Sequence, residues 1–266
     1  MGIVGGRLRL AARMVGGTSM AGHSKWAQIK RDKASNDSKR GAIFSKLSRE
    51  IYVAVREGGP SPDGNVRLRI ALERSKREGM SNDTIERAIA KGSGVSGEGE
   101  QYQTVIYEGY GPAGMAIMAV ALTDNRNRTA AEVRQAFNRH GGALGESGTV
   151  AWQFDTIGQI IVAANGHDPD DVALQAIDAG ASDVAPEDDE IFVTTEPGDL
   201  TDVTEALKSS GLEITESGIT RVPQNTVDLD AGQTQTAIKL LDALEDLEDV
   251  QEVFTNASFA ENAVPA

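Results

Sequence analysis

The stretch from residue 20 to residue 33 holds side chains of the kinds that bind nucleic acid. It carries four cations against one acid, with an indole ring, a histidine and a serine among them. These residues are His23, Ser24, Lys25, Trp26, Lys30, Arg31 and Lys33. Lysine and arginine can pair with phosphates, and an indole can stack on a base. A second interpretation is a solvated arm in which Trp26 and Ile29 dock on the next helix. These residues alone do not decide between the two.

The charge distribution along the chain favours the first interpretation. Residues 1–95 contain 19 basic and 9 acidic side chains, whereas residues 96–266 contain 7 basic and 31 acidic ones. Such an asymmetry indicates nucleic-acid contact at the basic end. The acidic part would repel a polyanion and so orient the basic part toward it. An acidic body that serves only solubility is the alternative.

Length and composition set the broad class. At 266 residues, the chain is long enough for two or three domains. It has no cysteine, which excludes disulfides and thiolate sites, and no apolar run reaches the roughly 20 residues that cross a bilayer. Residues 1–19 hold three arginines and no acid, which is typical of a transit peptide, but Met20 favours an unstructured upstream extension. We expect a cytoplasmic protein, or a mitochondrial matrix protein if residues 1–19 are a transit peptide.

Residues 20–96 are predicted to form a basic helical domain that positions the arm. Ile43, Leu47, Ile51 and Val55 recur every four residues, as one side of an amphipathic helix requires. Two shorter helices are expected after the Gly58–Gly64 turn. Further candidate nucleic-acid contacts in this domain are Lys39, Arg40, Lys46, Arg49, Arg67 and Arg69. Lys46 and Arg49 are expected on the solvent side of their helix.

The remainder is predicted to be α+β. From Gly158 onward the pattern follows a βαββαβ order, which is typical of the ferredoxin-like fold. The last helix and strand then lack a partner, so we expect them to complete a sheet that begins near Thr104. The predicted domains are therefore a discontinuous one, residues 97–155 and 223–262, and a ferredoxin-like one, residues 156–222, inserted in it. Alternation of Val150, Trp152 and Phe154 predicts a half-buried strand.

The motifs that could carry catalysis or a cofactor have simpler explanations. Gly109-x-Gly111-x-x-Gly114 matches a dinucleotide fingerprint, but Pro112 lies inside it and an apolar strand follows, so a hairpin is favoured. The three histidines lack metal-ligand spacing, and the sequence has neither a nucleophile elbow nor a P-loop. We therefore predict no enzyme, no cofactor and no metal site.

A second cluster of polar residues lies at Asp124-Asn-Arg-Asn-Arg128, where a strand meets a helix. Arg126 and Arg128 are two of the few basic residues after residue 95, and an anion site beside a helix N-terminus would suit them. Alternatively, the two arginines pair with local acids and the stretch only shapes the turn. Thr129-Ala-Ala-Glu132 has the pattern of a capping box at the start of that helix.

Six motifs, in order, resemble the YebC/PmpR family, which includes the mitochondrial translational activator of cytochrome c oxidase subunit one. They are Ala21-Gly-His-Ser-Lys-Trp-Ala-Gln-Ile-Lys30, Phe44-Ser-Lys-Leu-Ser-Arg-Glu-Ile51, Gly59-Pro-Ser-Pro-Asp-Gly-Asn65, Tyr107-Glu-Gly-Tyr-Gly-Pro112, Thr123-Asp-Asn-Arg-Asn-Arg-Thr129 and Gly142-Ala-Leu-Gly-Glu-Ser-Gly-Thr-Val-Ala-Trp152. The similarity runs from Met20 to about Phe259. Asp32 departs from the family pattern, which continues the arm with consecutive basic residues.

This resemblance implies a cytoplasmic, non-enzymatic protein with one helical and two α+β domains. Bacterial members are described as DNA-binding transcriptional regulators, and other members act on translation at the ribosome. The expected function is therefore a DNA-binding transcriptional regulator. One alternative is a translation factor bound to ribosomal RNA, and a second is an interaction module that binds protein partners through its acidic domains. No membrane partner is expected.

Overall fold

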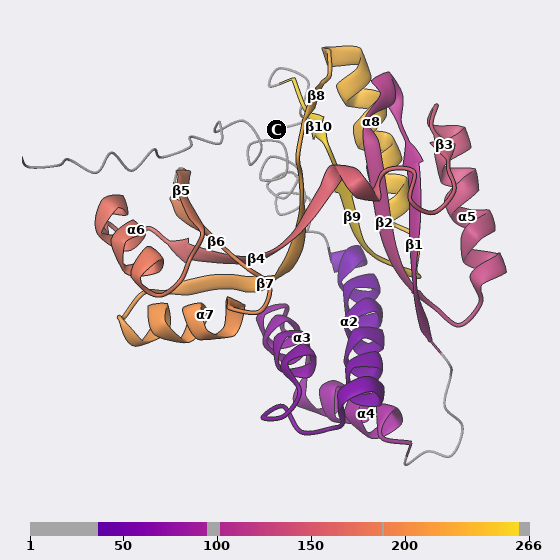
Figure 1. Cartoon of the computed structure of the whole chain (residues 1–266). Helices are drawn as coiled ribbons and strands as arrows, with labels where there is room; N and C mark the ends of the chain where they lie inside the picture. The colour runs from indigo at the N-terminus through magenta and orange to yellow at the C-terminus, as the bar shows by residue number, and fades with distance from the viewer. Residues whose placement is uncertain (1–36, 95–101, 188, 261–266) are drawn as a thin grey trace, which may run out of the picture.

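The computed structural model describes residues 37–94, 102–187 and 189–260. These residues form three lobes, one of helices alone and two that each contain a sheet (Figure 1). The fold is α+β, as predicted. Within the described residues, no helix is long and apolar enough to span a membrane.

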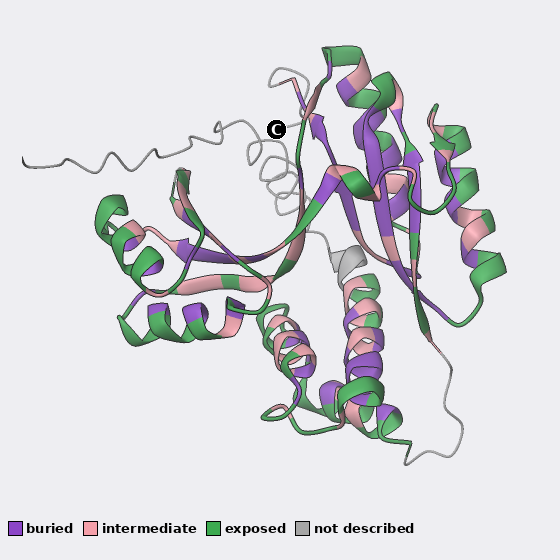
Figure 2. Ribbon diagram, viewed as in Figure 1, coloured by how far each residue is buried: buried purple, intermediate pink, exposed green. Residues whose placement is uncertain are grey.

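The helical lobe consists of α2 (Asp37–Gly58), α3 (Val66–Arg77) and α4 (Asn82–Gly92). Its core is built on the predicted side of α2, where Leu47, Ile51 and Val55 are buried against Leu68 of α3 and Ile85 of α4. Figure 2 shows much of α2 in purple where it lies beside the shorter helices. The four-residue period of apolar residues is therefore explained by packing within this lobe.

Asn65 fixes the turn between α2 and α3. Its side-chain oxygen accepts a hydrogen bond from the Leu68 amide at 3.0 Å and so caps α3. Its side-chain nitrogen donates to the carbonyl oxygens of Ala54 and Gly59, at 2.7 and 2.8 Å. Gly59 adopts a φ of +84°, which a residue with a side chain rarely does. The motif from Gly59 to Asn65 is thus explained by the geometry of the turn.

The first sheet has the strand order β3-β1-β2-β9 and carries α5 (Arg126–Arg139) and α8 (Ala231–Glu245) on one face (Figure 1). Its strands are β1 (Gln103–Tyr110), β2 (Ala116–Thr123), β3 (Ala143–Leu144) and β9 (Val250–Thr255). Phe137 of α5 and Leu240 of α8 are fully buried between the helices and the sheet. Two short strands, β8 (Val227–Asp228) and β10 (Ala257–Ser258), pair beside it.

The glycine motif at Gly109–Gly114 is a hairpin connection, as predicted. β1 and β2 pair in antiparallel register on either side of it, and the 3₁₀ turn η1 (Pro112–Gly114) joins them. Gly109 must be glycine for a packing reason, because a Cβ there would lie 2.5 Å from the Ala143 carbonyl oxygen. No helix N-terminus follows the motif, so it lacks the geometry that a dinucleotide requires.

The second sheet has the order β5-β6-β4-β7, which is the ferredoxin-like arrangement of a βαββαβ unit. Its elements are β4 (Phe154–Ala163), α6 (Pro169–Asp178), β5 (Asp183–Glu187), β6 (Glu190–Thr195), α7 (Leu200–Ser209) and β7 (Ile214–Pro223). Val172 of α6 and Val203 of α7 pack on Ile160 and Val193 of the sheet. Because β9 pairs with β2, the chain returns to the first sheet after this unit.

Two strands, β4 and β7, connect the sheet-containing lobes. They pair in antiparallel register from Phe154 with Pro223 to Val162 with Ile214. Phe154 packs in a cluster with Ala116 and Phe254 of the first sheet, whereas Ile160 belongs to the core of the second. Strand β4 therefore enters both cores, and β7 runs paired beside it.

Two local predictions were wrong. Residues 151–153 form a 3₁₀ turn, η2 (Ala151–Gln153), and the Trp152 side chain is 65% exposed, so Val150 and Trp152 are not part of a strand. Helix α5 begins at Arg126 and is capped by Asn125, whose side chain accepts a hydrogen bond from the Arg128 amide at 3.1 Å. Thr129 therefore lies inside the first turn and is not the cap.

Candidate nucleic-acid interface

The candidate residues of the arm lie outside the described residues. These are His23, Ser24, Lys25, Trp26, Lys30, Arg31 and Lys33. Lys39 and Arg40 fall in the first turn of α2. The remaining candidates, Lys46, Arg49, Arg67, Arg69, Arg126 and Arg128, have described side chains, and their contacts differ in kind.

Arg49 does not lie on the solvent side of α2 as expected, and only 8% of its side chain is exposed. Its guanidinium donates to the backbone oxygen of Glu248 at 2.6 Å and to the Glu248 carboxylate at 2.9 Å. The Asp249 carboxylate lies 3.5 Å away, and the Tyr102 ring lies beneath the guanidinium, with its centroid at 5.2 Å. Arg49 is therefore the contact that joins the helical lobe to the turn between α8 and β9. These contacts leave little of the Arg49 side chain exposed to a nucleic acid.

Lys46 lies one turn earlier on α2 and reaches the same partner lobe. Its ammonium group donates to the backbone oxygen of Glu245, at the end of α8, at 2.5 Å. A cation at the C-terminal end of a helix meets unpaired carbonyl groups and the negative end of the helix dipole. Close by, Tyr52 and Val53 of α2 pack on Leu122 of β2. The contact between α2 and the first sheet thus combines apolar packing with charged hydrogen bonds.

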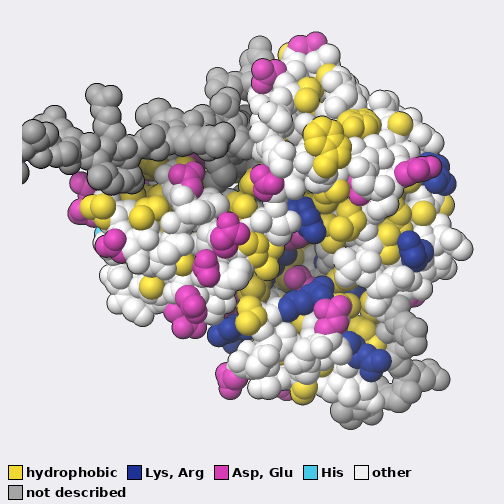
Figure 3. All heavy atoms as spheres, in the orientation of Figure 1, with side chains coloured by type: hydrophobic (Ala, Val, Ile, Leu, Met, Phe, Trp, Pro, Cys, Tyr) yellow, Lys and Arg dark blue, Asp and Glu magenta, His cyan; other side chains and the backbone are white. Residues whose placement is uncertain are grey.

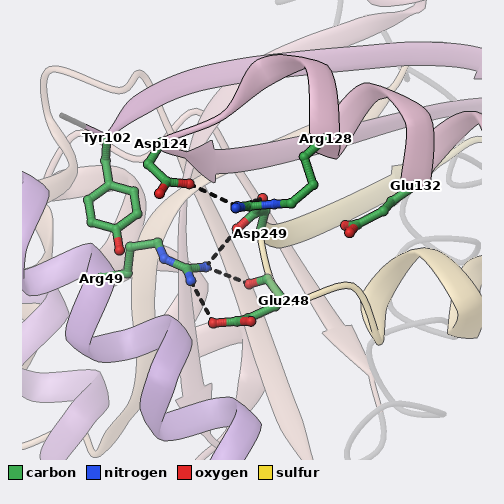
Figure 4. Close-up of a pocket in the computed structure, with 7 residues that line it drawn as sticks. All are labelled: Arg49, Tyr102, Asp124, Arg128, Glu132, Glu248 and Asp249. Carbon is green, nitrogen blue, oxygen red and sulfur yellow. Dashed lines mark hydrogen bonds and ion pairs between the residues drawn. The ribbon is translucent and has the colours of Figure 1, made fainter. Parts of the chain in front are cut away.

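Asp249 is the centre of this junction, and its side chain is only 3% exposed (Figure 4). One carboxylate oxygen accepts hydrogen bonds from the Thr129 hydroxyl at 2.6 Å, the Arg128 guanidinium at 2.7 Å and the Thr123 hydroxyl at 3.1 Å. The other oxygen faces Arg49. A buried carboxylate needs such partners, because burial without them is costly. Asp249 thereby connects α5, β2 and α2.

The surroundings of Asp249 lower its pKa. Burial alone would raise the pKa of this carboxyl group, but the hydrogen bonds from Thr129, Arg128 and Thr123 outweigh it. The hydrogen bonds that Arg128 donates to Asp249 and to Asp124 raise the pKa of its guanidinium above the ordinary value. Both groups are thus held in their charged forms.

Acidification is expected to remove the stability that Asp249 contributes. Since the folded pKa lies below the ordinary value of about 4, the stabilisation is complete above that value and is lost as the pH falls through the folded pKa. Urea denaturation of the wild type and of Asp249→Asn, in steps from about pH 7 to about pH 3 at constant ionic strength, measures it. The difference in unfolding free energy between the two proteins should shrink toward low pH. A difference that stays constant would contradict this assignment.

The sequence of residues 124–128 suggested either an anion site or arginines paired with local acids, and the two arginines differ in this respect. Arg128 pairs with Asp124 at 2.8 Å and with Asp249 at 2.7 Å, so it is a structural residue. The Arg126 side chain is exposed and makes no ion pair within the described residues. Beside this junction lies a polar cleft of about 290 Å³, lined by Arg49, Tyr102, Asp124, Arg128, Glu132, Glu248 and Asp249 (Figure 4). Because four acids line it against two arginines, this cleft does not suit a phosphate.

Helix α3 presents Arg69 and Arg77 on the side opposite its buried residues, Leu68, Ala71 and Ser75, whereas Arg67 and Arg74 flank its contact with α2. Arg67 pairs with Glu57 of α2. Arg69 lies 3.7 Å from Glu205 of α7, and Arg77 donates to the backbone oxygen of Thr215 in β7. Arg74 lies between Glu50 of α2 and Glu252 of β9, at 3.9 and 3.8 Å. The sequence had not singled out Arg74 and Arg77, although their spacing from Arg69 places all three away from the core.

Glu108 of β1 is a second buried carboxylate that the sequence had not singled out, and it is only 4% exposed. Its oxygens accept hydrogen bonds from the backbone amides of Gly148, Val150 and Ala151, each at 2.8 Å. Burial alone would raise its pKa, but these three amides together lower the pKa below the ordinary value. Two motifs far apart in the sequence, at Tyr107–Pro112 and Gly142–Trp152, are thereby joined. In the sequence, the one indication of this role was a single acid among the apolar residues of a predicted strand.

The described residues contain no group of three or more histidine, cysteine, aspartate or glutamate side chains placed to hold a metal ion. The charged side chains of the site instead do two things. Some of them fasten the lobes together, and others present cations at the surface. Figure 3 shows lysine and arginine side chains around the hollow where the three lobes meet.

Comparisons with known proteins cover nearly the whole described chain. A family model described as the TACO1/YebC N-terminal domain matches residues 24–95, and a model of the TACO1/YebC second and third domain matches residues 102–257. A protein of Thermomicrobium roseum named "Probable transcriptional regulatory protein" is 63% identical over 240 residues, which is 90% of this chain and 97% of that protein. A Moorella thermoacetica protein of the same name is 51% identical, over 90% and 95% of the two chains.

A solved structure supports the fold independently. The crystal structure of a conserved hypothetical protein from Aquifex aeolicus superposes with a TM-score of 0.81 at 47% sequence identity. The match covers 91% of this chain and all of the other. The resemblance drawn from the six sequence motifs is thus confirmed.

Proposed function

The chain belongs to the TACO1/YebC family, and we propose that it is a non-enzymatic regulator of gene expression that binds nucleic acid in the cytoplasm, with DNA as the favoured polymer. Relatives at up to 63% identity are named probable transcriptional regulatory proteins, which supports a role in transcription. The observation that carries the proposal is the concentration of 19 of the 26 basic residues in residues 1–95.

The proposed contacts are the basic residues of the arm and of the first turn of α2, together with Arg67 and Arg126, which join no lobes within the described part of the chain. They are Lys25, Lys30, Arg31, Lys33, Lys39, Arg40, Arg67 and Arg126, with Trp26 stacking on a base beside His23 and Ser24. Lys46, Arg49 and Arg128 have other partners, as described above. Dispersed cations of this kind contact the phosphate backbone, so binding should depend strongly on salt and weakly on sequence.

Replacing Lys30 and Arg31 together by alanine is expected to weaken binding and its salt dependence. Each phosphate contact contributes about 0.9 to the slope of log affinity against log salt on duplex DNA, so the slope should fall by roughly one to two. Fluorescence anisotropy of the full chain with a labelled mixed-sequence duplex, between about 50 and 200 mM salt, measures it. Single-stranded RNA of the same length serves as a second probe.

The matched control is Lys239→Ala, which removes a cation from the exposed surface of α8. It should leave both affinity and slope close to wild type. The proposal is wrong if the double variant and this control behave alike, or if a chain without residues 20–95 binds as well as the wild type. Tighter binding to the RNA than to the duplex would move the target from DNA to RNA.

A further inference from the structure

The outward side of α3 contacts the ferredoxin-like lobe through solvent-exposed polar groups. Its contacts with the ferredoxin-like lobe are the ion pair between Arg69 and Glu205 and the hydrogen bond from Arg77 to Thr215. Figure 1 shows α3 beside α7 and β7. The Glu205 carboxylate is two-thirds exposed, so water and salt reach this contact.

The contact between α2 and the first sheet is of a different kind. Arg49 and Asp249 are buried there, and Tyr52 and Val53 pack on Leu122. Buried, hydrogen-bonded charges with apolar packing hold firmly, whereas exposed ion pairs contribute little. The helical lobe is therefore fixed at α2 and only lightly held at α3.

The oxygen atoms that contact Arg69 and Arg77 belong to an unusually acidic lobe. Residues 154–223, from β4 to β7, contain 16 acidic and two basic side chains. Arg74 is different, because its ion pairs are with Glu50 of α2 and Glu252 of β9, outside this lobe. Burial would lower the pKa of its guanidinium, but Glu50 and Glu252, with a further contribution from Glu216 of β7, outweigh burial and raise the pKa. The Glu205 carboxylate at Arg69, with Glu216 near Arg74, provides negative charge of the kind that a phosphate would provide.

We propose that Arg69 and Arg77 on the outward side of α3, with Arg74 beside them, form a further phosphate-binding surface, and that the acidic ferredoxin-like lobe occupies it at Arg69 and Arg77 until nucleic acid displaces that lobe. Arg69 and Arg77 lie eight residues apart, which is about 12 Å along the helix, so the surface spans more than one phosphate. The inference rests on the proposed function, because it assigns further contacts and a competitor to the same nucleic-acid-binding lobe.

Removing the competing carboxylates tests this directly. The double variant Glu205→Gln/Glu216→Gln of the full chain should bind both the duplex DNA and the single-stranded RNA probe about two- to tenfold more tightly than wild type. The matched control, Asp178→Asn/Glu196→Gln, removes two negative charges from exposed positions of the same lobe, away from these contacts. Its affinity should change much less. Adding Arg69→Gln/Arg77→Gln to the first variant should abolish the gain, as a mutant cycle requires.

A distance measurement gives a second readout. The chain has no cysteine, so Val66→Cys on α3 and Ala206→Cys on α7 can be labelled selectively, and both positions are exposed. The distance between the labels should increase when saturating duplex DNA or single-stranded RNA is added to the full chain.

Equal gains in the contact and control variants, a gain that survives the arginine replacements, or a label distance that nucleic acid leaves unchanged would each overturn this inference alone. The proposed function would stand in those cases, because the wild type would still bind. Failure of the wild type and of every variant to bind either probe would overturn both.

Discussion

Replacing Asp249 by alanine is expected to lower the free energy of unfolding by about 3–5 kcal/mol, the cost of removing one partner from a buried charged network. The carboxylate holds the Thr123 and Thr129 hydroxyls and the Arg128 guanidinium within 3.1 Å, and it faces the buried Arg49. Without it, two buried hydroxyls and the half-exposed Arg128 lose an acceptor, and the buried Arg49 loses one of its two carboxylate partners. Urea denaturation followed by circular dichroism measures the change.

Asp124 provides the control for Asp249. Its carboxylate also pairs with Arg128, at 2.8 Å, but 42% of its side chain is exposed. Asp124→Ala should therefore cost less than about 1 kcal/mol, as exposed ion pairs do. Similar losses in the two variants would show that burial of the Asp249 network contributes nothing.

Glu108→Ala is expected to cost about 2–4 kcal/mol, because it leaves the amides of Gly148, Val150 and Ala151 without an acceptor. The loop from Gly142 to Trp152 should open as a result. Hydrogen exchange would detect this as faster exchange at those amides, together with the lower unfolding free energy from denaturation.

Glu146 lies in the same loop, and its side chain is exposed. Glu146→Ala should change the unfolding free energy by no more than about 0.5 kcal/mol and leave the three amides protected. If Glu108→Ala left them equally protected, the carboxylate would not be what holds the loop.

Local sequence patterns predicted helices and strands correctly where the residues that bury them lie nearby in the sequence. The apolar period of α2 depends on packing with α3 and α4, which follow directly in the chain. The hairpin at Gly109–Gly114 and the βαββαβ order likewise depend on nearby segments. In each case the side chain that satisfies the pattern lies in the same lobe.

Patterns failed where the partner lies far away in the sequence. The position of Arg49 on its helix predicts solvent exposure, but its guanidinium donates a hydrogen bond to Glu248, 199 residues later. Thr129 matches a capping box, but its hydroxyl donates to Asp249, 120 residues later. Val150 and Trp152 alternate like a strand, yet the Val150 amide turns toward Glu108, 42 residues earlier. A local sequence pattern carries no information about partners that lie so far away in the chain.

The paired strands β4 and β7 determine how the ferredoxin-like lobe can move. Ten residues of strand span roughly 33 Å, and the two strands are hydrogen-bonded along almost all of that length. Such a ribbon resists stretching and in-plane bending but can twist elastically, so the lobe can rotate but cannot move freely away. If nucleic acid frees α3 from this lobe, the lobe should rotate about the ribbon axis and return when the ligand leaves. The displacement of the lobe would be small, and the axis of the paired strands would determine its direction.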